Sequence, residues 1–457
     1  MILTILLYNR NLILSRLGLY MIKTILPLCS IISLRFFGLF LVLPVISVYA
    51  MTLHGANTTL VGIVIGGYAL TQMIFQLPFG ILSDKMGRKG TIIMGVLLFA
   101  IGSLICAVAV DILALLLGRL LQGAGAIGAV VTAMISDVVK EEQRPKAMGI
   151  MGASIAFSFA LAMLLGPIIS GFAGVESLFY LTAILALFSI YLVLKKVPNP
   201  PKITHTYSDA LHFMPVLKDA NLIRMNITNF LQKGLMTFAF MIIPMILINN
   251  FDWEMKELYK VYAPAMVLGV LAMAPAVILA EKKGMFKEVL IIGIIFFAIS
   301  YLMIGLGSSD MLFVIGVAVF FIGFNMHEPI MQSLATKFAK VHQRGMVLGI
   351  FNFFGYFGTF IGGLLGGIFF TKASLASIVI VIAVVCFIWT VLILFMPNPM
   401  KKQVAYIPLE NVNKEYCTRL NHKSFIDEWY INENENLLIV KYNTTDISKE
   451  EIEELLK

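Results

Sequence analysis

Charged residues are scarce in this sequence of 457 residues: they make up 13% of it, whereas hydrophobic residues make up 59%. Soluble globular chains carry about 25% charged residues, so the composition excludes a set of soluble domains and indicates a membrane protein. The four cysteines show neither the pairing of a disulfide framework nor the spacing of a metal site. The sequence also lacks a glycine-rich phosphate-binding loop, so we expect no ATP-driven step, no cofactor and no enzyme.

Long apolar runs fill most of the sequence. A helix of about 20 residues spans roughly 30 Å of hydrocarbon. The sequence has twelve runs of about that length, near residues 25–50, 60–82, 91–110, 112–136, 147–172, 177–195, 222–249, 259–280, 288–307, 311–335, 345–370 and 375–396. It therefore predicts an all-α polytopic membrane protein with twelve transmembrane helices.

Basic residues divide the loops between these runs into two alternating sets. One set holds eighteen Lys and Arg and the other holds three. Because Lys and Arg are retained on the cytoplasmic side of short loops, we expect both termini to be cytoplasmic and the protein to lie in the inner membrane. The net charge of +8 then reflects topology, and nothing favours nucleic acid as a partner. The basic set comprises the loops at 83–90, 137–146, 195–218, 281–288 and 337–344, with Lys401 and Lys402.

The first 20 residues precede a second methionine, Met21, which opens a more ordinary entry into a first helix. They lack the small-residue cleavage site of a signal peptide. We expect translation to begin at Met21 and residues 1–20 to be a mis-assigned extension. A short interfacial amphipathic segment is the alternative.

The sequence repeats itself at an offset of about 200 residues. Gln143-Arg144 recurs as Gln343-Arg344, and other glycines and prolines match at equivalent places. We therefore expect two six-helix halves, residues 21–196 and 221–397, joined by a cytoplasmic linker at 197–220. Parallel repeats around a central cavity are typical of transporters in which one half rocks against the other.

A dense group of charges, GILSDKMGRKG, stands between the second and third runs. Glycines let the chain reverse tightly, and an aspartate can accept hydrogen bonds from an arginine. We interpret the stretch as a latch on the cytoplasmic face; a turn with topogenic charge is the alternative, but it leaves the acid and the paired glycines unexplained. The latch residues are Gly80, Asp84, Lys85, Gly87, Arg88 and Lys89. The stretch returns in the second half as Glu281-Lys282 and Gly284.

This stretch resembles the signature between helices two and three of the major facilitator superfamily. Two further motifs agree: Arg119-Leu-Leu-Gln122-Gly123-Ala-Gly125 in helix four and Leu165-Gly166-Pro167-Ile-Ile-Ser170-Gly171 in helix five. The latter is similar to the motif of the drug:proton antiporter branch, with Ser170 where that branch usually has glycine. The resemblance implies the twelve-helix fold of that superfamily over residues 21–397.

Helix five carries small residues every four positions, which lets two backbones approach closely in lipid, and Pro167 bends it. The family resemblance implies that this helix packs against its counterpart in the other half and seals the cavity against ion leak. Ordinary close packing is the alternative. The motif residues are Gly152, Ser158, Ala162, Gly166, Pro167, Ser170 and Gly171.

Ionisable residues at membrane depth are expensive and functional by default. Glu328 is the acid that lies well inside an apolar run, so we predict it to be the proton carrier. The resemblance implies that Arg119 faces the cavity and responds to proton or substrate charge, and we add Arg35 and Asp84 to the proton-coupling set. The alternative for Arg35 is a side chain that snorkels to the membrane interface. The alternative is a structural pair of Glu328 with Arg35 or Arg119. Lys233 is a further candidate, and Arg224 and Asp137 are expected to be interfacial.

Polar side chains on both halves could line a mixed polar and apolar cavity. Each of them is as readily a link between helices. The cavity candidates are Tyr68, Gln72, Gln76, Gln122, Asn226, Asn229, Gln232, Asn325, His327, Asn352 and Tyr356.

Composition changes at about residue 400, where six Lys and Arg face eleven Asp and Glu in residues 403–457. Strands are predicted at Val404–Leu409, Phe425–Ile431 and Leu437–Tyr442, and helices at Asn413–Asn421 and Ser448–Leu456, the latter opened by a capping box. This order predicts a small α+β ferredoxin-like domain at 400–457 that is short of its last strand. A subgroup of bacterial drug:proton antiporters resembles the chain in carrying such a cytoplasmic appendage.

We therefore expect a secondary active transporter that exports small amphipathic or cationic compounds by alternating access, with the proton as coupling ion. Its partners would be a small-molecule substrate and the lipid bilayer, and we expect a monomer. Two alternatives stay open. One is an importer or exporter of a specific metabolite or sugar with the same fold, and the other is a non-transporting membrane sensor that acts through its soluble tail.

Overall fold

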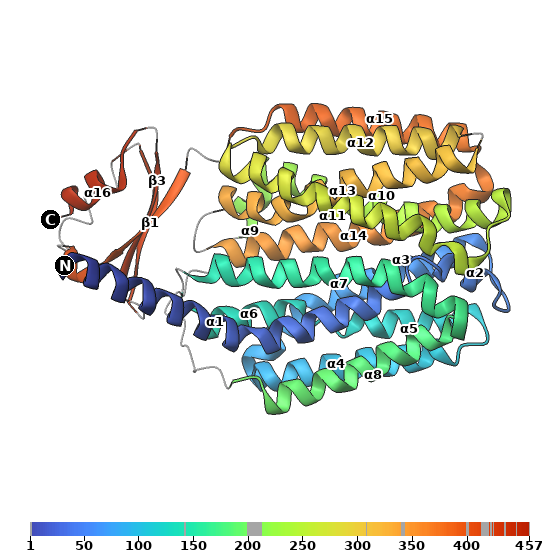
Figure 1. Ribbon diagram of the computed structural model, residues 1–457, viewed down its shortest axis with the longest axis horizontal. Helices are drawn as coiled ribbons and strands as arrows, with labels where there is room; N and C mark the ends of the chain where they lie inside the picture. Colours follow the sequence, from blue (N-terminus) through green and yellow to red (C-terminus); the bar gives the residue numbers. More distant parts are fainter. Residues whose placement is uncertain are drawn as a thin grey trace.

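The computed structural model describes residues 2–140, 143–198, 213–307, 309–339 and 343–398, and in the C-terminal region 402–412, 420, 423, 425–433, 436–444 and 446–456. Its helices run side by side, and a small domain lies at one end of the bundle (Figure 1). We call this end of the bundle the domain end and the opposite end the far end.

The twelve predicted membrane helices are confirmed, since twelve described segments are long and apolar enough to cross a membrane. Those of the N-terminal half are α1 (Ile2–Leu41), α3 (Thr58–Met86), α4 (Arg88–Ala107), α5 with α6 (Ile112–Ala124 and Gly128–Val138), α7 (Arg144–Ala173) and α8 (Glu176–Lys195). The backbone of residues 2–20 continues α1, and the candidate span within it is Met21–Leu41.

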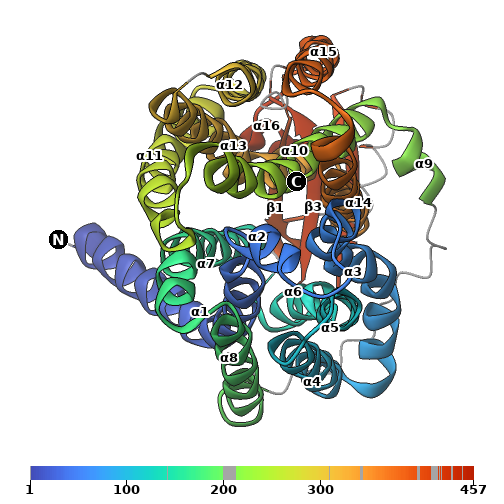
Figure 2. The same cartoon turned by 90° about the vertical axis from the view of Figure 1, so that its right-hand side faces the viewer.

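The C-terminal half repeats the arrangement. Its helices are α10 (Ala220–Phe251), α11 (Tyr259–Val277) continued by the π-helix η3 (Ile278–Lys282), α12 (Phe286–Leu306), α13 (Asp310–Phe338), α14 (Arg344–Lys372) and α15 (Leu375–Leu394). Short helices α2 (Ile46–Met51), α9 (Phe213–Lys218) and η2 (Met255–Glu257) lie in connections. Seen from the far end, the helices of one half lie beside those of the other (Figure 2).

Two predicted continuous runs are broken. The run at 25–50 ends as a helix at Leu41, turns around Pro44 and resumes as α2. The run at 112–136 breaks between Ala124 and Gly128. A methyl group on Gly125 would overlap the carbonyl oxygen of Gly95 on α4, so this break lies where two backbones touch.

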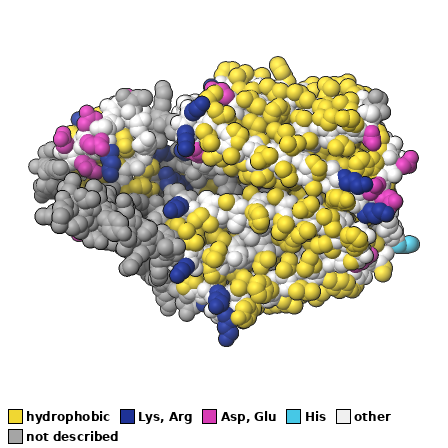
Figure 3. Space-filling view, in the orientation of Figure 1, with side chains coloured by type: hydrophobic (Ala, Val, Ile, Leu, Met, Phe, Trp, Pro, Cys, Tyr) yellow, Lys and Arg dark blue, Asp and Glu magenta, His cyan; other side chains and the backbone are white. Residues whose placement is uncertain are grey.

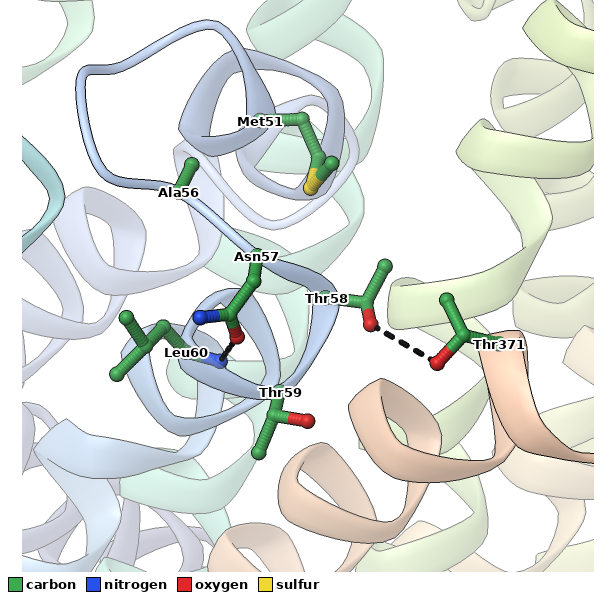
Figure 4. A pocket seen from close by; sticks show the side chains of 7 residues that line it. All are labelled: Met51, Ala56, Asn57, Thr58, Thr59, Leu60 and Thr371. Atoms are coloured by element: carbon green, nitrogen blue, oxygen red, sulfur yellow. Dashed lines mark hydrogen bonds between the residues drawn. The ribbon is translucent and has the colours of Figure 1, made fainter.

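The two halves converge at the far end through glycine. A methyl group on Gly62 of α3 would overlap the carbonyl oxygen of Gly363 on α14, and one on Gly367 would overlap that of Thr58. The Thr58 and Thr371 hydroxyls lie 3.3 Å apart across the same junction (Figure 4). Small residues allow such close approach of helices in an apolar medium.

The halves separate toward the domain end. Among the described residues, Gly80 on α3, Gly149 and Gly152 on α7, and Gly345 and Gly349 on α14 have no atom within 4 Å of the position where a side chain would begin. The apolar core agrees, because one cluster joins both halves while a second holds buried residues of the N-terminal half alone. The bundle is therefore closed at the far end and open toward the small domain.

The C-terminal domain contains a three-stranded antiparallel sheet, as predicted. Its strands are β1 (Lys402–Pro408), β2 (Ile426–Asn432) and β3 (Leu437–Asn443), in the order β1-β3-β2. That order fits a ferredoxin-like sheet without its last strand. Helix α16 (Lys449–Leu455) follows, and Ser448 and Glu451 form the predicted capping box. The helix predicted at Asn413–Asn421 lies largely outside the described residues.

Lys441 on the central strand fixes this domain to the bundle. Its side chain is 5% exposed, and its ammonium donates to the carbonyl oxygens of Lys337 at 3.0 Å and Ala339 at 2.5 Å, at the end of α13. A cation at a helix C-terminus satisfies carbonyl groups that have no partner within the helix. The domain is thus anchored to the C-terminal half.

A disulfide across the far end should trap this state. In a Thr58→Cys/Thr371→Cys variant, oxidation should join the two helices and abolish transport, and reduction should restore it, because the two hydroxyls already lie 3.3 Å apart. Gel mobility after cleavage between the halves measures the crosslink. Crosslinking with undiminished transport would show that the far end does not need to open.

Candidate functional site

Arg88 joins three elements at the domain end of the N-terminal half. Its guanidinium donates to Asp84 at 2.6 Å, to Asp137 at 2.9 Å and to the Ser83 hydroxyl at 2.6 Å. Gly87 turns the chain just before it with φ 87°, a conformation that favours glycine. Of the predicted latch residues, Asp84 and Arg88 bond to each other within one half, and Lys85 is exposed.

Asp137 is the stronger partner of Arg88, contrary to the expectation that it is only interfacial. Its side chain is 11% exposed, whereas that of Asp84 is 66% exposed. A charge-assisted hydrogen bond gains strength as water is excluded from it. The sequence does not reveal this pair because Asp137 ends α6, far along the chain from Arg88.

The C-terminal half carries a counterpart to this cluster, as the repeat predicts. Glu281 pairs with Lys337 at 3.1 Å and accepts a hydrogen bond from Ser333, both on α13. Gly284 follows with φ 72°, matching Gly87. In each half, an ion pair therefore connects the region after the second membrane helix to the end of the fourth.

Some residues of the helix-five motif contact their own half and others contact the C-terminal half. Gly166 lies against the Leu41 carbonyl of α1, within its own half. Helix α7 does pack against the other half, but against α11 and η2; its counterpart α14 packs against α3, so the expected pairing with the counterpart is wrong. Gly171 makes the cross-half contact, against Lys256 of η2. Gly152 faces open space, Ala162 and Ser158 are buried, and Ser170 donates to the carbonyl of Pro167.

Glu328 lies within α13 and pairs with Lys233 of α10, at 2.9 and 2.7 Å. Gln232 also donates to it at 3.2 Å. The side chains are partly exposed, 23% for Lys233 and 30% for Glu328. The expected alternative, a pair with Arg35 or Arg119, is wrong, since Lys233 is the cation that Glu328 meets.

Arg35 and Arg119 instead form a cluster in the N-terminal half, linked by Gln122. The side-chain oxygen of Gln122 accepts from Arg119 at 2.7 Å, and its carbonyl accepts from Arg35 at 3.5 Å. Arg35 also donates to Gln72 at 3.2 Å. Both arginines are buried, with 2% and 0% exposure.

Gln72 connects this cluster to the other half by donating to the Tyr356 hydroxyl at 2.6 Å. Aromatic rings continue the junction: Phe159 of α7 lies 5.7 Å from Phe324 of α13, centroid to centroid, and 4.8 Å from Phe40. The Lys233 ammonium lies 5.0 Å from the ring centre of Phe324. The two charged clusters are thus joined by an aromatic surface that crosses between the halves.

The other cavity candidates are placed less centrally. Asn229 donates to Phe351, Asn325 to Phe321 on its own helix, and His327 bonds to Leu290 of α12, so these three link helices or backbone. Tyr68 stacks on Arg119 at 4.6 Å. Of the remaining candidates, Asn226 is buried, whereas Gln76 and Asn352 are half-buried.

The space-filling surface fits a membrane protein, with a hydrophobic band along the bundle and basic side chains gathered at the domain end (Figure 3).

The sequence matches the Major Facilitator Superfamily over residues 28–287 and again over 227–430.

Two relatives cover most of the chain. The inner membrane transport protein YajR of Escherichia coli is 34% identical over 437 residues, covering 94% of this chain and 96% of YajR. The quinolone resistance protein NorA of Staphylococcus aureus is 27% identical over 372 residues, covering 79% of this chain and 94% of NorA. Among solved structures, the nucleoside transporter NupG shares the fold, with a TM-score of 0.66 at 15% identity over 81% of this chain and 99% of that one.

The Arg88 cluster yields an ordered series of variants. Asp137→Asn should lower the free energy of unfolding by roughly 2 kcal/mol, since it weakens a sheltered charge-assisted bond, whereas Asp84→Asn should cost less than about 1 kcal/mol because water screens its exposed pair. Lys85→Gln, the control, should change little and should impair transport less than Asp84→Asn. Thermal unfolding of the purified variants measures the three losses of stability. An equal loss in all three would mean that the loop contributes only the charge that sets the topology.

Proposed function

The chain belongs to the major facilitator superfamily, and from that premise we propose that it exports small amphipathic compounds in exchange for protons. The observation that carries this proposal is the Lys233–Glu328 pair, which is held at membrane depth and partly exposed. A group that binds a proton from one side and releases it to the other must reach water without lying in bulk water, and a partly exposed carboxylate within an apolar helix suits that role.

The pair supplies a coupling step. When Glu328 takes up a proton it loses the charge that holds Lys233, and the freed ammonium then bears an uncompensated charge among apolar helices. That cost favours a different arrangement of α10 and α13, or the arrival of a substrate that restores the balance. Proton binding and substrate binding thereby act on the same two side chains.

The direction of transport follows from two further arguments. The basic residues gathered at the domain end favour a cytoplasmic position for that end, and on this proposal the described state is open to the interior. NorA is named as a quinolone resistance protein, which favours outward transport for a chain of similar sequence. The closed far end then opens in the second half of the cycle, as alternating access requires.

Glu328→Gln mimics the protonated acid, so it should abolish uphill extrusion driven by a pH gradient while leaving downhill exchange of substrate in place. Glu288→Gln, at an exposed acid near the start of α12, serves as the matched control and should behave as wild type. Accumulation of dye in inverted vesicles, with and without a proton uncoupler, measures the difference, since export from the cell is uptake into such vesicles. Proton-driven release of dye from their lumen would instead favour an importer of the same fold.

The double variant Lys233→Met/Glu328→Gln separates coupling from structure. It removes both charges together, so it should recover the stability that either single variant loses. If the pair carries coupling, the double variant still fails to pump uphill. Restored proton-driven export in the double variant would show that the pair is structural and that the carrier is another residue.

A further inference from the structure

Two arginines in the N-terminal half keep hydrogen-bond donors without a partner. Arg35 Nε and Nη1 and Arg119 Nη2 are buried and unbonded in the part of the chain that the structure describes. The contacts that Arg35 does make are long, at 3.2 and 3.5 Å. Charge-assisted hydrogen bonds to a committed partner are about 2.7–2.9 Å, so this guanidinium is only weakly engaged.

The two charges are also uncompensated. Among the described residues no carboxylate forms an ion pair with either arginine, whereas Lys233 in the other half has Glu328. Aromatic rings offset part of the cost, since Arg35 lies 5.4 Å from the centre of Phe99 and Arg119 lies 4.6 Å from that of Tyr68. Arginine cannot lose its proton in a protein, so the positive charge persists.

A chain of hydrogen bonds connects Arg35 to the surface between the halves. Arg35 bonds to Gln72, and Gln72 bonds to Tyr356, which is half-buried and belongs to the other half. Tyr356 and Gln72 are therefore the side chains that must move for a compound between the halves to reach the guanidinium.

We infer that Arg35 and Arg119 bind an oxyanion, a carboxylate or sulfonate, on an amphipathic substrate. The inference rests on the proposed function and names the substrate class of the same transport site. It replaces the cationic compounds expected from the sequence with anionic or zwitterionic ones. The apolar body of the substrate would lie on Phe36, Phe40 and Phe159, which lead from Arg35 to the Lys233–Glu328 pair.

A pair of fluorescent probes tests the sign of the charge. Pyrenebutyrate and pyrenebutyltrimethylammonium share an aromatic body and differ in their charged group. Saturable binding to the purified full-length protein, followed by energy transfer from its tryptophans at equilibrium and without a pH gradient, should be at least tenfold tighter for the butyrate. Equal affinity, or tighter binding of the ammonium probe, would overturn the inference.

Variants then locate the site. Arg35→Gln should remove the tenfold preference, and Arg35→Lys should retain part of it, because the charge stays while the planar donor group is lost. The control Arg224→Gln, whose arginine donates to Asn221 on its own helix, should leave the preference unchanged. Equal loss in Arg35→Gln and Arg224→Gln would assign the preference to general surface charge and contradict the site.

The two proposals fail separately. Glu328→Gln should keep the preference for the butyrate, since the binding measurement needs no proton gradient. A protein that prefers the butyrate but does not exchange protons for substrate would contradict the exchange mechanism and leave the anion site supported. A protein that exports substrate in exchange for protons but binds both probes equally would contradict the anion site and leave the exchange mechanism supported.

Discussion

The cost of holding a charge away from water governs this molecule. Three ion pairs of the bundle join partners within one half: Arg88 with Asp137, Lys233 with Glu328 and Lys337 with Glu281. The junction between the halves is made instead of glycine backbone, threonine hydroxyls and aromatic rings. Each half is therefore stiffened internally, while the surface between them can part without separating opposite charges.

Apolar run length was sufficient to predict the twelve helices, because bilayer thickness fixes how long a spanning helix must be. It could not predict the breaks at Pro44 and Gly125 or the closed far end. Those depend on which backbones touch, and a glycine has the same hydropathy whether it faces lipid or another helix. Gly62 and Gly66, and Gly363 and Gly367, share the four-residue spacing that drew attention to helix five, so a signal for the seal was present.

Candidate residues were easier to name than to pair. Glu328 stood out as an acid in an apolar run, whereas its partner Lys233 lies on a helix whose rotation the sequence does not fix. His327 showed the reverse: it titrates near neutrality in isolation, yet here it bonds to Leu290, toward α12. Asp137 was undervalued for the same reason, since its burial depends on how α4 and α6 pack. The proton-carrier role of Glu328 stays a prediction.

The two hydrogen bonds from Lys441 tie the small domain to the end of α13 in the C-terminal half. If the halves rock and these bonds hold, the domain moves with the C-terminal half and shifts relative to the N-terminal half. Because the domain lies beyond the end of the helices, a small rotation of the C-terminal half displaces the domain more than it displaces the helices. The opening of the transporter becomes readable from a distance between two labels, one on the domain and one at the start of α4, neither of which touches the substrate path.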